Sequence, residues 1–136
     1  MSRFIVYTGG TFDILHKGHI NLLKSCKKIS GYDGKVVVGL NTDDFIERYK
    51  GNAPYRSYID RKAVLEACKY VDEVIPFETE QDLVDMILTI NPDIRIVGEE
   101  YKDKEHTGKG LCHIHYNKRR HSFSSSELRE RVTNAK

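Results

Sequence analysis

The stretch at residues 9–19, which reads GGTFDILHKGH, restricts the fold of this chain more than any other. An apolar run at residues 4–7 precedes it, and an apolar pattern with helical spacing follows it. The stretch therefore predicts a strand, a glycine turn and a helix start, where backbone N–H groups can hold a phosphate. His16 and His19 are three residues apart, which puts both imidazoles on one face of the first helical turn. Together with the room that Gly18 leaves for a ligand, they indicate chemistry on a triphosphate.

The rest of the chain alternates between short apolar runs and helical patterns. The expected strands are at residues 3–8, 35–40, 71–75, 94–97 and 111–116, and the expected helices are at residues 19–30, 42–49, 58–70, 81–90 and 124–132. Pro76 is expected to stop the third strand. Residues 50–58 are rich in turn formers and predict a mobile loop over the site. The alternation predicts one α/β domain over residues 1–136, a parallel sheet of about five strands with helices on both faces.

Length and composition narrow the class of protein. The 136 residues suffice for one domain, and 39% hydrophobic with 31% charged residues is typical of a soluble globular chain. No apolar run approaches the roughly 20 residues that span a bilayer, and the N-terminus lacks the apolar segment of a signal peptide. We therefore expect a cytoplasmic protein with no membrane partner. Its three cysteines are widely spaced and odd in number, which indicates free thiols rather than disulfides or a zinc site.

The charge distribution offers two interpretations. The net charge of +2 does not point to nucleic acid, but four of the six histidines lie in the basic segment at residues 106–121. Such a patch suits a polyanion, or it is a solvated basic face; a phosphate-rich small ligand explains it equally well and agrees with the N-terminal stretch. His113 and His115 could also share one side of a strand and bind a metal, although no cysteine or carboxylate completes a zinc set nearby.

The motif T-F-D-x-x-H-x-G-H at residues 11–19 resembles the signature of the cytidylyltransferase family of nucleotidyltransferases. The resemblance continues through NTDDF at residues 41–45, RK at 61–62, YVDEVIP at 70–76, GEEY at 98–101 and the serine-rich stretch at 119–126. It covers most of the chain. It implies a small Rossmann-like nucleotidyltransferase fold and a homodimer.

The resemblance also implies roles for individual residues. It makes His16, His19 and Lys50 catalytic, with Arg48 as a rival for Lys50 because this sequence is one residue longer here. It assigns nucleotide binding to Gly10, Thr11, Phe12, Asp13, Gly18, Gly98, Glu99, Arg119, Ser124, Ser125 and Ser126. It assigns the acceptor substrate to Arg61, Lys69 and Asp72, where Lys69 departs from the family's arginine. Asp13 could instead only shape a turn. Arg120, His121 and Ser122 replace the family's threonine, glutamate and glycine.

The implied reaction is attack of a phosphorylated small molecule on the α-phosphorus of a nucleoside triphosphate, with pyrophosphate leaving. The resemblance favours CTP and glycerol 3-phosphate, with Mg²⁺ held mainly through the triphosphate. An adenylyltransferase acting on a sugar phosphate such as heptose phosphate is an alternative, because residues 91–94 and 98–102 also resemble that group. A nucleotide-binding protein that has lost catalysis is another, because the serine-rich motif is altered. The hypothesis of a nucleic-acid-binding module is supported only by the basic segment at residues 106–121.

Overall fold

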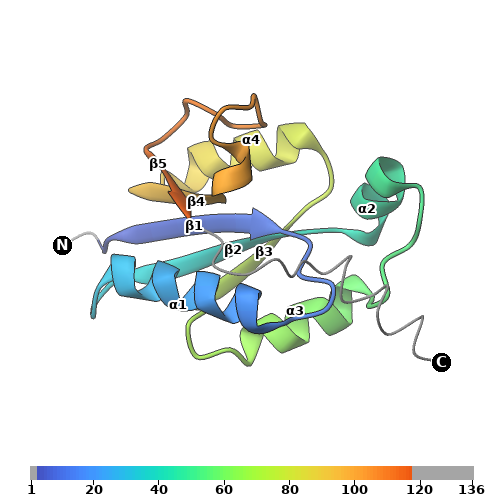
Figure 1. Ribbon diagram of the computed structural model, residues 1–136, viewed down its shortest axis with the longest axis horizontal. Helices are drawn as coiled ribbons and strands as arrows, with labels where there is room; N and C mark the ends of the chain where they lie inside the picture. Colours follow the sequence, from blue (N-terminus) through green and yellow to red (C-terminus); the bar gives the residue numbers. More distant parts are fainter. Residues whose placement is uncertain (1–2, 118–136) are drawn as a thin grey trace.

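A computed structural model describes residues 3–117 and shows a five-stranded sheet in the order β3-β2-β1-β4-β5, with every strand pair parallel (Figure 1). The strands are β1 (Ile5–Gly10), β2 (Lys35–Asn41), β3 (Glu73–Phe77), β4 (Ile94–Gly98) and β5 (Ile114–Asn117). The helices are α1 (Lys17–Ser30), α2 (Asp43–Lys50), α3 (Tyr58–Glu66), α4 (Glu80–Ile90) and the 3₁₀ turn η1 (Glu99–Tyr101). The predicted α/β class with a parallel sheet is thereby confirmed.

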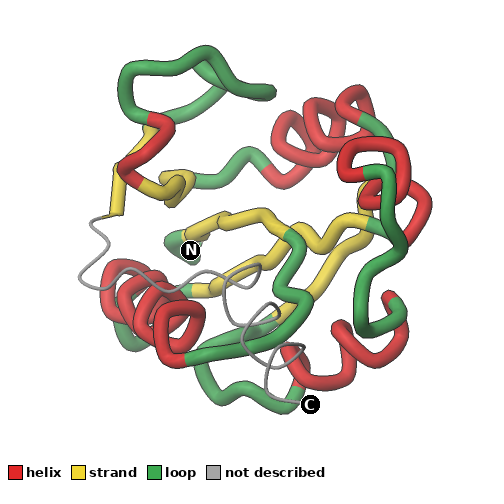
Figure 2. The backbone as a smooth tube through the Cα atoms, turned by 45° about the vertical axis from the view of Figure 1, so that its right-hand side comes forward, coloured by secondary structure: helices red, strands yellow, loops and turns green. Residues whose placement is uncertain are grey.

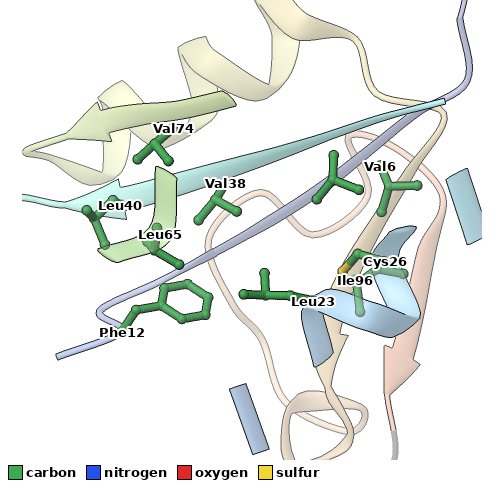
Figure 3. Close-up of a cluster of buried hydrophobic side chains, with 10 residues drawn as sticks. Val6, Phe12, Leu23, Cys26, Val38, Leu40, Leu65, Val74 and Ile96 are labelled. Carbon is green, nitrogen blue, oxygen red and sulfur yellow. The ribbon is translucent and has the colours of Figure 1, made fainter. Parts of the chain in front are cut away.

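The sheet has a buried core on each face because α1 and α3 cover one side and α4 covers the other (Figures 1 and 2). Val6 and Val38 point into the first core, where they meet Leu23 of α1 and Leu65 of α3 (Figure 3). Tyr7, the next residue along β1, points into the second core with side chains of α4. The absence of polar alternation in β1 and β2 follows from this burial on both faces.

The Tyr7 side chain lies along the sheet in the second core, with its hydroxyl next to Gly9 and Gly39. Its hydroxyl would lie 2.9 Å from a Cβ placed on Gly9, and a Cβ on Gly39 would overlap it outright. The ring is fully buried, and burial raises the pKa of the Tyr7 phenol well above its usual range, despite the neighbouring guanidinium of Arg95. Gly9 of β1 and Gly39 of β2 therefore leave the space that this ring occupies.

Side-chain caps fix where the helices begin. Thr42 accepts from the N–H of Phe45 at the start of α2, and Ser57 accepts from the N–H of Asp60 at the start of α3. At α4, Thr79 and Asp82 form a reciprocal capping box. These caps confirm the expected start of α2 and the cap at Ser57, whereas α3 ends at Glu66, before the predicted residue 70.

The predicted bounds of the third and fifth strands also need correction. The third strand runs over Glu73–Phe77 and includes Pro76, which was expected to stop it. Among the described residues β3 pairs with β2 alone and lies at the edge of the sheet, so a residue without an N–H costs no interior ladder bond. The fifth strand begins at Ile114 rather than residue 111. The helix expected at residues 124–132 lies outside the described residues.

Two aspartates extend the sheet at its amino edge by the same geometry. The backbone N–H of Asp72 donates to Val36 O at 3.0 Å, and its carboxylate accepts from Val36 N–H at 2.7 Å. Asp93 makes the equivalent pair with Ile5, at 2.9 and 2.7 Å. Each carboxylate takes the place of a backbone carbonyl on a neighbouring strand. Asp72 thereby satisfies a backbone N–H at the start of β2, and Asp93 satisfies one at the start of β1.

Candidate active site

The site is built on the turn between β1 and α1, at the carboxyl edge of the sheet, where parallel sheets bind ligands. Phe12 occupies this turn with a φ of 45°, a left-handed conformation that is unfavourable for a bulky side chain. Its buried ring packs 5.1 Å from the ring of His19 and belongs to the first core (Figure 3). Core packing therefore holds the strained turn, and the turn sets the position of the histidines.

His16 and His19 cap the first turn of α1 with their own rings. His16 is the N-cap residue, so α1 begins two residues before the predicted start at residue 19, and His16 Nδ1 accepts from Gly18 N–H at 3.0 Å. His19 Nδ1 accepts from His16 N–H at 3.2 Å. The two rings stack with centroids 3.9 Å apart and an interplanar angle of 25°. The structure thus confirms that both imidazoles share one face of the helix start.

These caps assign the proton of each imidazole. A nitrogen that accepts a backbone N–H carries no proton, so in both rings the proton is on Nε2. In this tautomer each ring carries an Nε2–H donor, a group that suits an anionic oxygen. Two such donors side by side suit the non-bridging oxygens of a phosphoryl group.

The N-terminus of α1 differs in charge from those of the other helices. Its first turn carries no acidic residue and begins with Lys17, whereas α2, α3 and α4 each have at least one carboxylate in the first turn. The first turn of α1 itself thus supplies no carboxylate to offset the positive end of the helix dipole. With the two histidines, this makes the α1 start a suitable place for phosphate.

Asp13 ties the turn to the loop that precedes α3. It is fully buried, and its two oxygens accept from the backbone N–H groups of Tyr55 at 2.9 Å and Arg56 at 2.8 Å. Asp13 was expected either to bind nucleotide or only to shape a turn. These bonds favour a role in organising the backbone, although that backbone belongs to a loop distant in sequence. The predicted mobile loop at residues 50–58 is held at its second half by these bonds.

Arg61 joins several segments of the protein around the turn. Its side chain is completely buried, and its donors go to protein oxygens: Thr11 O at 3.0 Å, Asn41 O at 2.8 Å, Arg56 O at 3.1 Å and the Asp43 carboxylate at 2.7 Å. Asn41 also donates to the Thr11 hydroxyl at 3.0 Å. The guanidinium thus joins the turn, the end of β2 and the start of α2. These contacts give Arg61 an internal, organising role, and its expected contact with the acceptor stays a prediction.

Lys50 and its rival Arg48 are separated by their contacts. Arg48 donates to Glu78 O at 3.0 Å and pairs with Glu80 at 3.4 Å. Lys50, the exposed last residue of α2, has no ion pair with the described residues. Its position at the carboxyl edge, next to the loop at residues 51–57, favours Lys50 over Arg48 for contact with a ligand.

Lys69 and Asp72 precede β3 and lie at the amino edge of the sheet, opposite to the histidines. Asp72 is engaged by Val36 and by Lys27, whose Nζ lies 2.9 Å from its carboxylate. The Lys69 ammonium lies 5.2 Å from the ring centroid of Tyr70. Within one chain the structure does not bring these two residues to the site, and their expected part in the acceptor pocket stays a prediction.

The remaining predicted site residues divide into two sets. Gly98 ends β4, next to β1, and Glu99 opens η1, so both are at the carboxyl edge with Gly10, Thr11 and Gly18. Arg119, Ser124, Ser125 and Ser126, with the departures at residues 120–122, lie outside the described residues. Between residues 3 and 117, no three histidine, cysteine or acidic side chains gather as a metal site, so His113 and His115 find no third ligand there.

A cavity of about 270 Å³ opens beside the turn, on the side of α3. It is lined by Phe12, Asp13, Ile14, Leu15, Arg56, Arg61 and Val64. Sequence reasoning missed Arg56 and Asn41, since their relation to the turn depends on contacts between distant segments. In the described part of the chain, no helix is both long and apolar enough to cross a membrane.

Comparison with known proteins places this geometry in a family. The description "Cytidylyltransferase-like" matches residues 7–131. The chain belongs to the cytidylyltransferase-like family. Glycerol-3-phosphate cytidylyltransferase of Bacillus subtilis is 36% identical over 132 residues, which is 97% of this chain and 98% of that protein.

Two further relatives of this cytidylyltransferase-like chain cover different shares of their own length. The bifunctional protein HldE of Campylobacter fetus is 42% identical over 107 residues, which is 78% of this chain but only 22% of that protein. The crystal structure of the lipopolysaccharide core biosynthesis protein from Thermoplasma volcanium shares 26% identity and superposes with a TM-score of 0.62, covering 98% of this chain and 89% of that one. The family and the fold identify the chain as a nucleotidyltransferase.

Proposed function

We propose that this nucleotidyltransferase transfers a cytidylyl group from CTP to glycerol 3-phosphate, giving CDP-glycerol and pyrophosphate. The observation that carries the proposal is the end-to-end similarity to an enzyme named glycerol-3-phosphate cytidylyltransferase. The Staphylococcus aureus enzyme of the same name is likewise similar over nearly its whole length.

This reaction depends on positioning the two substrates and on stabilising negative charge on the phosphates more than on a general base. An oxygen of the acceptor phosphate forms the new bond to the α-phosphorus, and the bond from that phosphorus to the bridging oxygen of pyrophosphate breaks. The acceptor is largely ionised near neutral pH, because the second pKa of a phosphate monoester is about 6. The Nε2–H groups of His16 and His19 would donate to the phosphoryl oxygens, and Lys50 would approach from the end of α2.

Mg²⁺ would neutralise part of the triphosphate charge when it is bound. The residues fit a metal that arrives with the nucleotide, because Asp13, the carboxylate nearest the histidines in sequence, already accepts two backbone N–H bonds. Mg²⁺ commonly keeps water and phosphate ligands with few carboxylates. The protein's part is therefore to hold the phosphates through the histidines and the α1 N-terminus.

The alternatives predict other substrates or no turnover. An adenylyltransferase would use ATP with a sugar phosphate such as heptose phosphate, and a catalytically weakened protein would bind nucleotide without releasing pyrophosphate. Pyrophosphate release should be measured with CTP and ATP against glycerol 3-phosphate and heptose phosphates. Release with CTP and glycerol 3-phosphate supports the proposal; release only with ATP and a sugar phosphate contradicts it. Binding without turnover favours the weakened protein.

The assembly and location are part of the proposal. We expect a homodimer in the cytoplasm with no nucleic-acid partner, as the family resemblance and the composition suggest. Sedimentation equilibrium should give twice the chain mass of 15.7 kDa. Tight oligonucleotide binding that weakens steeply with salt would instead favour a nucleic-acid module.

A further inference from the structure

The cavity beside the β1–α1 turn has the size and composition of a subsite for a small ligand. Its volume of about 270 Å³ lies just below the range of roughly 300–1,000 Å³ that holds drug-sized molecules. It is therefore too small for a whole nucleoside triphosphate. Ile14, Leu15 and Val64 form an apolar wall, and the charged lining residues are Asp13, Arg56 and Arg61.

Only one of the three charges is available to a ligand. Arg61 donates to the Asp43 carboxylate and to three backbone oxygens, and both oxygens of Asp13 accept backbone N–H bonds. The Arg56 guanidinium, in contrast, makes no hydrogen bond or ion pair with any residue from 3 to 117. An exposed cation at the mouth of a mostly apolar cavity suits a small anion attached to a short carbon skeleton.

The backbone of Arg56 is fixed although its side chain is not. Its N–H donates to Asp13 at 2.8 Å, and its C=O accepts from Arg61 Nε at 3.1 Å. Both partners are buried. The guanidinium is thereby presented from a fixed backbone position. The Asp13 that holds this position is three residues before His16, the N-cap of α1. A preorganised fork loses little freedom when it binds a phosphate.

We propose that Arg56 binds the phosphate of the acceptor substrate, and that Ile14, Leu15 and Val64 pack against its carbon skeleton. This inference rests on the proposed transfer to a phosphorylated small molecule. It replaces Arg61 by Arg56 as the arginine that contacts the acceptor. The small cavity selects a short phosphorylated polyol over a larger sugar phosphate.

The test is steady-state kinetics of Arg56→Ala with CTP, Mg²⁺ and glycerol 3-phosphate. Loss of a charged hydrogen bond predicts a rise of about 10- to 100-fold in the acceptor KM, with the CTP KM within about twofold. Arg3→Ala is the matched control, because it removes the same exposed side chain at the amino edge of the sheet; its acceptor KM should not change. Arg56→Lys should be intermediate, since it keeps the charge and loses the fork.

Val64→Phe tests the cavity from the side of α3. The larger ring fills space beside Ile14 and Leu15, so the acceptor KM should rise while CTP still protects the protein against thermal unfolding. Inorganic phosphate should compete with the acceptor in the wild type and lose potency in Arg56→Ala. If Arg56→Ala does not fold, as judged by circular dichroism, Arg56→Lys and Val64→Phe carry the test.

The outcomes separate the inference from the proposed function. Wild-type turnover with an unchanged acceptor KM in Arg56→Ala overturns the inference and leaves the proposed function standing. A parallel rise in the CTP KM also overturns it, because Arg56 would then serve the triphosphate. Absence of wild-type turnover with every phosphorylated acceptor overturns the proposed function and, with it, this inference.

Discussion

The Nδ1 atom of His19 accepts the backbone N–H of His16 at 3.2 Å, so one histidine holds the cap on which the other depends. Substitution by alanine would therefore remove both a cap and a ring. We propose two variants that separate these roles. Asn is among the best N-cap residues, and Gln at the third helical position completes a capping box. His16→Asn and His19→Gln should keep the helix start and lose only the imidazole.

The expected result for both variants is a fall in kcat of about 10²–10³-fold with little change in the CTP KM, because donors to the reacting phosphate act mainly in the transition state. The melting temperature should stay near that of the wild type. Pyrophosphate release at saturating substrate concentrations measures kcat, and thermal unfolding measures the melting temperature. A variant that retains nearly full kcat would remove that histidine from the chemistry.

Asp13 is expected to control the loop that precedes α3. In Asp13→Asn one acceptor becomes an NH₂ group that faces a backbone N–H, so either Tyr55 or Arg56 loses its bond. Loss of a charged, buried hydrogen bond costs about 1.5–3 kcal/mol. Limited proteolysis should then cut faster within residues 50–57. In the wild type, cutting there should slow when CTP and Mg²⁺ are added; equal rates would contradict a loop that closes over ligand.

Arg61 should be needed for stability more than for binding. Arg61→Lys keeps a charge but cannot reach Thr11, Asn41 and Asp43 together, and we expect a loss of about 2–4 kcal/mol in the free energy of unfolding. Denaturant titration measures it. Arg48→Ala is the control, because its ion pair with Glu80 is half exposed and should contribute under about 1 kcal/mol. A selective rise in the acceptor KM without loss of stability would restore Arg61 to the substrate.

Lys50 should matter for turnover and Arg48 should not. Lys50→Ala is expected to lower kcat while the melting temperature stays within a few degrees, because the ammonium is exposed and makes no ion pair with the described residues. Arg48→Ala carries the same loss of charge two residues away on α2. If Arg48→Ala is inactive and Lys50→Ala is active, the two assignments must be exchanged.

Asp72 gives a prediction for acid stability. Burial raises the pKa of its carboxyl, but hydrogen bonds from Val36 and Lys27 outweigh burial and hold the pKa below its usual value. The charged form thus stabilises the fold fully above the unfolded-state pKa of about 3.9, and this contribution is lost as the pH falls through the lower folded-state pKa. Asp72→Asn keeps an acceptor for Val36 but cannot titrate.

The melting temperature of the wild type should therefore fall more steeply below about pH 4 than that of Asp72→Asn. Near neutral pH the variant should lose at most about 1 kcal/mol, since its pair with Lys27 is partly exposed. Its acceptor KM should match the wild type. A rise in that KM alone would return Asp72 to the substrate, for example across a dimer contact.

The local features of this fold could be predicted from sequence, whereas its long-range contacts could not. The two histidines three residues apart located the α1 start, and the valine run located β2. Arg61, in contrast, had the right residue type for phosphate, and only its proximity to Thr11, 50 residues away, revealed an internal role. Pro76 was misjudged because nothing local tells an edge strand from a central one.

The glycine pair at the end of β1 bears two constraints from opposite directions. Gly10 is the predicted nucleotide-binding residue of the pair, whereas a Cβ on Gly9 would lie 2.9 Å from the Tyr7 hydroxyl, and a Cβ on Gly39 would overlap that hydroxyl. Positions 7, 9 and 39 are therefore sterically coupled. A smaller residue at position 7 should therefore make room for side chains at positions 9 and 39, because the aromatic ring, independently of any ligand, requires glycine there.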